Sequence, residues 1–181
     1  AIDLPRSTEF FKLAAMAGHT QAQFIYAMCL KEGSGVDVSE SLAMEYFKKT
    51  ADGGHIESQY QLALLQSKSD RKKAYPYYLK AALQNHFSAQ FECVQYQIQY
   101  NCDLAHCLRF CEQLVAQGNL QVSFILARLL DTGIAGKTDK ARAYQYYLSL
   151  VNSNNTLAHY YCALIMEVHQ DLVAARKHYE A

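Results

Sequence analysis

The chain has 181 residues, of which 51% are hydrophobic and 19% charged, and it contains 2 Pro and 8 Gly; this composition is typical of a folded globular chain and excludes a disordered one. Lys plus Arg and Asp plus Glu both number 17, so the zero net charge provides no broad electrostatic attraction to nucleic acid or to anionic membranes. No apolar stretch approaches the roughly 18 to 20 residues that cross a bilayer, and the start, AIDLPRSTEF, lacks the basic and apolar regions of a signal peptide.

The chain is built from an internal repeat. A small residue recurs at steps of 36, 31, 33 and 36 residues, at Ala22, Ser58, Ala89, Val122 and Ala158. An aromatic residue follows each of them two positions later, at Phe24, Tyr60, Phe91, Phe124 and Tyr160. Because the apolar residues of each period are spaced three and four apart, each period is predicted to contain two α-helices, a first and a second.

A further set of columns marks the second helix of each period. Pairs of mostly aromatic residues stand at Phe10-Phe11, Tyr46-Phe47, Tyr77-Tyr78, Phe110-Cys111, Tyr146-Tyr147 and His178-Tyr179. Before each pair comes a residue of the type that caps helix N-termini, at Asp3, Ser39, Asp70, Asp103, Asp139 and Asp171. After each of the first five pairs comes a residue suited to a left-handed helix end, at Gly18, Gly54, Asn85, Gly118 and Asn154.

In chain order, these columns predict one repeat domain over residues 1–181. Residues 1–19 are predicted to hold a second helix without its partner. Complete hairpins are predicted at 20–55, 56–86 and 120–155, with a degenerate hairpin at 87–119 and a truncated one at 156–181. Both ends cut a repeat, and arrays of this kind normally need capping repeats, so we expect a fragment of a longer array.

Residues 131–140, DTGIAGKTDK, raise the question of a phosphate-binding loop. That loop has the pattern G-x-x-x-x-G-K-[ST], with its Lys and its Ser or Thr in the first turn of the following helix. Here Asp131 replaces the first glycine, and Asp139 is predicted to cap the helix, which leaves Lys137 and Thr138 outside it. The preceding run, SFILARLL, is predicted to be a helix and not a strand. No nucleotide binding is therefore expected.

The segment AQFIYAMCLKEGSGVDVSESLAMEYFKKTADGGH resembles the Sel1-like repeat, a helical-hairpin relative of the tetratricopeptide repeat (TPR). The matching positions are Ala22, Ala27, Gly33, Gly35, Val36, Ala43, Tyr46, Phe47, Lys48, Ala51 and Gly54. The resemblance implies an all-α fold, a right-handed α-solenoid of stacked helix-turn-helix repeats that forms a TPR/Sel-like superhelix. It also implies a protein-binding scaffold or adaptor that assembles a complex in signalling, quality control or bacterial host interaction.

No catalytic residue, cofactor site or metal site is predicted, and an enzyme is not expected. The acids that can be placed by column fall at helix caps, and the chain lacks a strained nucleophile turn such as G-x-S-x-G. His19, His55 and His86 share one column, so they are expected to lie about one hairpin apart, too far for a shared ion. The expected partner is another protein or peptide, without nucleic acid, nucleotide or membrane insertion.

Six cysteines leave three alternatives open; they are Cys29, Cys93, Cys102, Cys107, Cys111 and Cys162. Four of them sit in columns otherwise filled by apolar, aromatic or small residues, which favours buried reduced thiols and with them a cytoplasmic protein. Disulfides, which join the helices of some Sel1-like proteins, would instead indicate a secreted, disulfide-stabilised member. Cys107, Cys111 and the nearby His106 provide the third alternative, a metal site.

The binding surface is predicted on the first helices, which line the concave groove in this architecture. Positions zero, two, four, five and eight from the small residue are assigned to the core, and positions three, six and seven to the groove. The predicted groove residues are Ile25, Met28, Cys29, Gln61, Leu64, Leu65, Glu92, Gln95, Tyr96, Ile125, Arg128, Leu129, Tyr161, Leu164 and Ile165. Most are apolar or aromatic, which is typical of an interaction surface.

Overall fold

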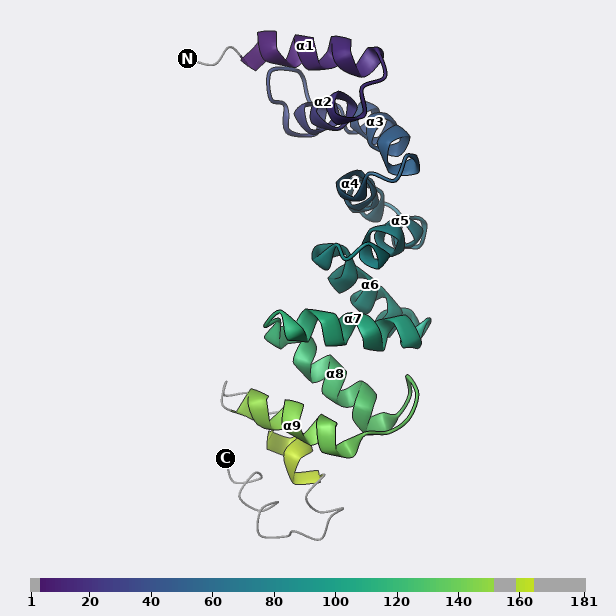
Figure 1. The fold of residues 1–181 in the computed structure, drawn as a ribbon, viewed down its shortest axis with the longest axis vertical. Helices are drawn as coiled ribbons and strands as arrows, with labels where there is room; N and C mark the ends of the chain where they lie inside the picture. The colour runs from purple at the N-terminus through teal and green to yellow at the C-terminus, as the bar shows by residue number, and fades with distance from the viewer. Residues whose placement is uncertain (1–3, 152–158, 165–181) are drawn as a thin grey trace. The chain divides into compact units, whose positions relative to one another are not determined.

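The computed structural model describes residues 4–151 and 159–164, and in this part of the chain the regular structure is helical throughout (Figure 1). The helices are α1 (Leu4–Met16), α2 (Thr20–Glu32), α3 (Glu40–Asp52), α4 (Ile56–Ser67), α5 (Arg71–Leu83), α6 (Phe87–Tyr100), α7 (Leu104–Ala116), α8 (Leu120–Thr132) and α9 (Lys140–Val151). Residues 159–164 are also helical. The predicted all-α fold is confirmed, and α2, α4, α6 and α8 are the first helices of the hairpins.

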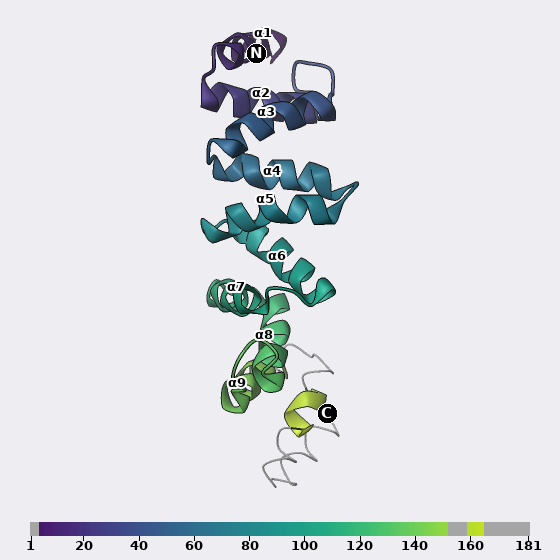
Figure 2. The same cartoon turned by 90° about the vertical axis from the view of Figure 1, so that its right-hand side faces the viewer.

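The chain forms two compact units, which divide inside α6 between Cys93 and Val94. In unit 1, helices that are consecutive in sequence contact each other from α1 to α5. Figure 2 shows α4 and α5 side by side, joined at one end by a short turn. In unit 2, α8 contacts both α7 and α9. Packing between neighbours in sequence is the arrangement of a helical repeat array, in which no single hairpin buries its own apolar face.

The helix ends lie where local chemistry predicts them. The side chains of Ser39, Asp70 and Asp139 accept hydrogen bonds from backbone N–H groups three residues later, at 3.4, 3.1 and 3.0 Å. These bonds satisfy donors that a helix leaves free in its first turn. The predicted left-handed residues are confirmed, with φ of 92°, 92°, 65° and 84° at Gly18, Gly54, Asn85 and Gly118. Asp3, Asn154 and Asp171 lie outside the described residues.

The predicted side-chain cap at Asp103 is wrong, although Asp103 does occupy the N-cap position of α7. Asp103 precedes α7 as expected, but its backbone is left-handed, with φ of 52°, and its side chain makes no capping hydrogen bond. The carboxylate instead lies 2.7 Å from Nδ1 of His106. A capping residue normally has an extended backbone, which directs its side chain toward the first N–H groups of the helix. The α6–α7 connection does not provide that backbone.

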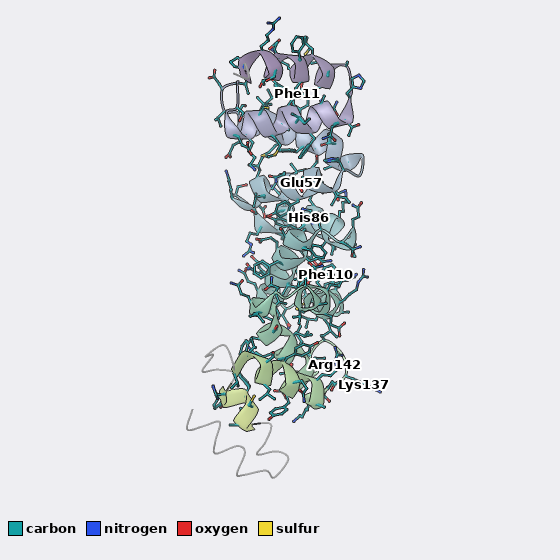
Figure 3. All side chains as sticks on the ribbon, turned by 60° about the vertical axis from the view of Figure 1, so that its left-hand side comes forward. Phe11, Glu57, His86, Phe110, Lys137 and Arg142 are labelled. Carbon is teal, nitrogen blue, oxygen red and sulfur yellow. The ribbon has the colours of Figure 1, made fainter. Side chains whose placement is uncertain are left out.

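The core of unit 1 is formed by the repeat columns of small and large residues. Its buried members include Ala22, Tyr26, Leu30, Ala43, Phe47 and Leu62, and Phe11 packs against them from α1 (Figure 3). In unit 2, Phe110, Leu126 and Tyr147 are fully buried. Small residues allow the helices to approach closely, and the large ones fill the space between them. The aromatic column after the small residue is only half-buried, and Tyr160 is exposed.

The segment DTGIAGKTDK connects two helices. SFILARLL lies within α8, as predicted, and Asp139 caps α9, so Lys137 and Thr138 precede the helix. Lys137 is exposed on this loop (Figure 3). Gly133 ends α8 with φ of 65°, and a Cβ there would lie 2.7 Å from Cγ2 of Thr138. The glycine therefore serves the helix end and the tight loop, which needs both a left-handed backbone and the absence of a side chain.

The six cysteines form no disulfide in the described part of the chain, and Cys93, Cys107, Cys111 and Cys162 are buried. Burial raises the pKa of the Cys162 thiol to about 11. A hydrogen bond between Cys107 and Cys111, together with burial, raises the pKa of the Cys111 thiol. Within the described residues, no group of three or more His, Cys, Asp or Glu side chains is arranged to hold a metal ion. No helix in the same part of the chain is long and apolar enough to span a membrane.

Candidate protein-binding surface

Four of the predicted groove residues are buried, which corrects their assignment to an open surface. Gln61, Leu65, Tyr96 and Leu129 are only 8%, 5%, 9% and 4% exposed. Leu65, Tyr96 and Leu129 all stand seven positions after the small residue. On a helix, positions zero, four, seven and eight form one continuous stripe. In these three helices position seven therefore belongs to the buried face, and the open surface is narrower than predicted.

The other predicted residues remain at least partly accessible to solvent. Gln95 and Arg128 are exposed. The half-buried members are Ile25, Met28, Cys29, Leu64, Glu92, Ile125, Tyr161 and Leu164. Ile165 lies outside the described residues. Among the predicted positions, position six is accessible in every described repeat, and position three is accessible in all of them except at Gln61. The side chains at these positions range from polar to apolar.

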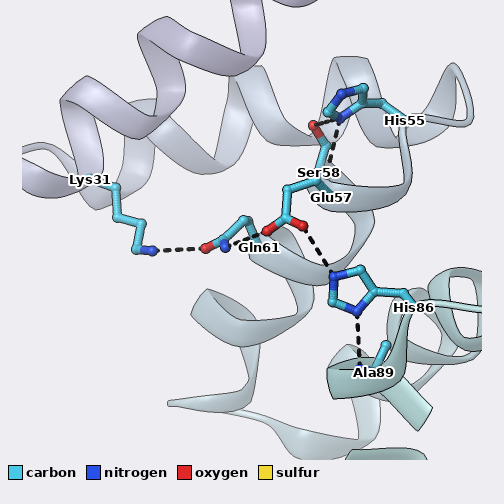
Figure 4. Close-up of polar contacts among 7 residues, drawn as sticks. All are labelled: Lys31, His55, Glu57, Ser58, Gln61, His86 and Ala89. Atoms are coloured by element: carbon cyan, nitrogen blue, oxygen red, sulfur yellow. Dashed lines mark hydrogen bonds and ion pairs between the residues drawn. The ribbon is translucent and has the colours of Figure 1, made fainter. Parts of the chain in front are cut away.

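In unit 1, a chain of polar contacts joins α2, α4 and the start of α6 (Figure 4). Nζ of Lys31 donates to Oε1 of Gln61 at 2.8 Å, and Nε2 of Gln61 donates to Oε1 of Glu57 at 2.8 Å. The other carboxylate oxygen of Glu57 lies 3.1 Å from Nε2 of His86. We call these four side chains the Glu57 network. The network satisfies hydrogen-bonding groups of Gln61 and Glu57 within the chain. These groups are therefore already engaged and are not open to a partner protein.

The hydrogen bonds of His86 identify its tautomer. Its Nδ1 accepts from the backbone N–H of Ala89 at 3.2 Å, so this nitrogen carries no proton. The proton therefore resides on Nε2, which donates to Glu57. Burial of Glu57 opposes ionisation, but the hydrogen bonds from Gln61 and His86 outweigh it, and the pKa of Glu57 lies below its ordinary value. Glu57 is thus held as a carboxylate by its neighbours.

Sequence reasoning considered the repeat-end histidines only as metal ligands and missed their structural role. His55 and His86 each precede a first helix, and Nδ1 of each accepts from the backbone N–H three residues later, at 3.2 Å in both cases. The ring of His55 lies 4.7 Å from that of Phe24, and the ring of His86 stacks 4.5 Å from that of Tyr60. The recurrence of His at one column was the signal for this role.

A glutamine column was also missed. Gln23, Gln59 and Gln90 each follow the small residue directly, and their Nε2 atoms donate to the carbonyls of Ala15, Ala51 and Ala82. The distance is 3.2 Å in all three repeats. Each bond ties a first helix to the end of the preceding second helix. The recurrence of Gln can be read from the sequence. Its partner cannot, because a backbone carbonyl is present at every residue.

An apolar pocket of about 210 Å³ opens in unit 2. We call it the α8 pocket; its lining residues are Ile98, Asn101, Leu104, Phe124, Ile125, Arg128, Leu129, Thr132 and Ile134. Three of the predicted groove residues, Ile125, Arg128 and Leu129, are among them. The other walls come from the end of α6, the start of α7 and the loop after α8. The spacing of residues within one helix could not predict that these other segments line the pocket.

The Sel1 repeat family model matches residues 3–19, 20–55, 56–86 and 123–155, which is more than half of the chain. No curated protein sequence gives a significant match. Among solved structures, the chain is similar to c5321, a protective antigen of uropathogenic Escherichia coli strains that displays an SLR fold, with 25% identity and a TM-score of 0.73. That match covers 91% of this chain and 37% of c5321, so the chain spans little more than a third of that protein.

Two further structures share the fold. A Sel1 repeat protein from Oxalobacter formigenes is 21% identical, with a TM-score of 0.65 over 88% of this chain and 72% of that one. The MamA RS-1 ArsTM double mutant is 16% identical, with a TM-score of 0.57 over 96% of this chain and 90% of that one. The repeat columns, the stacked hairpins and the family match agree. The chain therefore belongs to the Sel1 repeat family.

Proposed function

We propose that the chain is a scaffold that binds another protein or peptide, and that the α8 pocket is its principal contact site. The observation that carries this proposal is a mostly apolar pocket, lined from three helices and two loops. Its rim includes Ile98 and Ile134, which are 43% and 58% exposed. Exposed apolar side chains around a concavity are typical of interaction sites. The Sel1 repeat fold, generally used for protein interaction, supports the same conclusion.

This proposal is tested by comparing the proteins that the wild type and a variant with a substituted pocket rim capture. Each purified protein is immobilised, incubated with a lysate of cells that express the wild type and crosslinked, and the captured proteins are identified by mass spectrometry. We expect the double variant Ile98→Asp, Ile134→Asp to lose the proteins that the wild type captures, because charges on the rim oppose burial of a partner's apolar side chain. Val38→Asp is the matched control, since Val38 is 62% exposed in the α2–α3 loop.

Circular dichroism establishes that all variants retain the helix content of the wild type. If the double variant captures the same proteins as the wild type and the control, the α8 pocket is not the contact site. If capture depends on the pocket, the identity of the captured protein decides among complexes in signalling, quality control and bacterial host interaction. A host-interface role is one form of this proposal, since c5321 is described as a protective antigen.

We further propose that the protein resides in a reducing compartment, with the cytoplasm favoured over secretion. The support is the state of the cysteines, which form no disulfide in the described part of the chain and are mostly buried, whereas disulfides form and persist in oxidising compartments. Thiol titration without reductant should detect six thiols after unfolding. In the folded protein, the half-buried Cys29 and Cys102 should react first. Fewer than six thiols after unfolding would support the secreted, disulfide-stabilised alternative.

A further inference from the structure

Arg128 is a cation at the α8 pocket, and it forms no ion pair with an acidic side chain among the described residues. It is exposed, it lines the pocket, and the lining contains no Asp or Glu. Asp131, three residues further along α8, makes no ion pair with Arg128 within the described residues. The guanidinium group thus lies beside apolar side chains with its hydrogen-bond donors available to a ligand.

Several other charged side chains are already engaged in ion pairs. In unit 1, Glu57 contacts His86 at 3.1 Å, and Glu92 lies 3.6 Å from Nη2 of Arg71. In unit 2, Arg142 on α9 pairs with Glu112 at 2.8 Å. Arg128 differs from these residues because its surroundings are apolar and its charge is not matched inside the described part of the chain. A ligand that brings a carboxylate would supply the missing partner.

We propose that the occupant of the α8 pocket is an acidic segment of a partner protein, in which an apolar side chain fills the pocket and a neighbouring Asp or Glu pairs with Arg128. This inference rests on the proposed function and adds the chemistry of the partner. The planar guanidinium presents donors in a fork that matches a carboxylate in two parallel hydrogen bonds. The apolar walls accommodate the neighbouring apolar side chain of the segment.

The test is peptide selection with a charge reversal. A phage library of random linear peptides is selected in parallel on the wild type, on Arg128→Glu and on Arg109→Glu. Arg109 is exposed on α7 and does not line the pocket, so its reversal is the matched control. We expect the wild type and the control to enrich peptides with Asp or Glu near an apolar residue. Arg128→Glu should enrich Lys or Arg at that place instead.

Binding of the enriched peptides is then measured by fluorescence polarisation with synthetic peptides. Arg128→Glu should weaken the best acidic peptide by about tenfold or more, because like charges replace an interfacial ion pair. Salt should weaken binding to the wild type more than binding to Arg128→Glu, since exposed ion pairs are screened. Each peptide is made with a free and with an amidated C-terminus. A requirement for the free C-terminus would overturn the assignment to an acidic side chain.

Two outcomes separate this inference from the proposed function. In the first outcome, the selected peptides do not bind the variant Ile98→Asp, Ile134→Asp, show no preference for acidic residues and bind Arg128→Glu as tightly as the wild type. This result would overturn the inference and leave the pocket as the contact site. Failure to enrich any peptide whose binding depends on Ile98 and Ile134 would overturn both. Circular dichroism and melting of every variant exclude loss of folding as the cause.

Discussion

At the scale of single residues, Tyr147 has a buried hydroxyl group without a hydrogen-bond partner in the described part of the chain. Its side chain is fully buried. Burial raises the pKa of Tyr147, which keeps the phenol protonated. The ring stacks on that of Tyr161 with centroids 5.1 Å apart. The aromatic body of Tyr147 therefore stabilises unit 2, while its hydroxyl carries a desolvation cost.

Tyr147→Phe is expected to raise the free energy of unfolding by about 1 kcal/mol, because it removes a buried polar atom that lacks a partner. Tyr78→Phe is the matched control from the same column. The Tyr78 hydroxyl donates to Oγ of Ser67 at 3.4 Å, so its removal should lower stability by about 0.5 to 1.5 kcal/mol. Urea denaturation measures both. A loss of stability in Tyr147→Phe would show that its hydroxyl does find a partner in solution.

The Glu57 network makes a pH-dependent contribution to stability. The pKa of Glu57 is lower in the folded protein than its ordinary value. A carboxyl group with a depressed folded pKa stabilises the fold above its unfolded pKa of about 4.3, and this contribution disappears as the pH falls through the folded value. Glu57→Gln should therefore melt below the wild type at pH 7, and the difference should shrink as the pH is lowered below about 4.

Glu45→Gln is the control for this experiment, because Glu45 is exposed on α3 outside the Glu57 network. Its melting temperature relative to the wild type should not follow the same pattern. Thermal melts between pH 7 and pH 3 provide the measurement. A constant difference between Glu57→Gln and the wild type over this range would contradict a depressed pKa at Glu57.

At the scale of helices, the N-caps distinguish the regular hairpins from the irregular α6–α7 connection. Asp139→Ala should lower the free energy of unfolding by about 1 kcal/mol, because Asp139 accepts from the backbone N–H of Arg142. Asp103→Gly should cost less than Asp139→Ala, because the left-handed backbone of Asp103 favours glycine and offsets the loss of its contact with His106. Denaturant unfolding compares the two. A loss at Asp103→Gly as large as that at Asp139→Ala would restore a capping role for Asp103.

At the scale of the whole molecule, the two units are expected to respond separately to a core substitution. Phe47 is fully buried in unit 1, and Phe47→Ala should cost about 3 to 5 kcal/mol. Because each hairpin contacts mainly its neighbours, hydrogen exchange should increase in α2 to α5 and remain near the wild-type rate in α8 and α9. Phe110→Ala in α7 is expected to produce the converse. Equal acceleration of both units would indicate one cooperative structure.

The binding surface shows where prediction from sequence fails. Leu65 and Tyr96 were assigned to an open groove because their column varies between repeats, yet both are buried. Variation within a column does not distinguish a solvated position from a core position that accepts several apolar side chains. Arg128, assigned to the groove by its position in the repeat, is exposed, as is usual for a charged side chain without a partner.

The sequence by itself determined the helices, their ends and the repeat family. These features depend on interactions over a few residues: the apolar spacing of a helix, the side-chain cap at Asp70 and the left-handed backbone at Gly54. Only the tertiary structure decided that Glu57 meets His86, 29 positions away, and that Ile98, Arg128 and Ile134 surround one pocket. Such contacts depend on how far each helix is rotated and shifted against its neighbours. That geometry follows from the packing of many side chains at once, and no short segment encodes it.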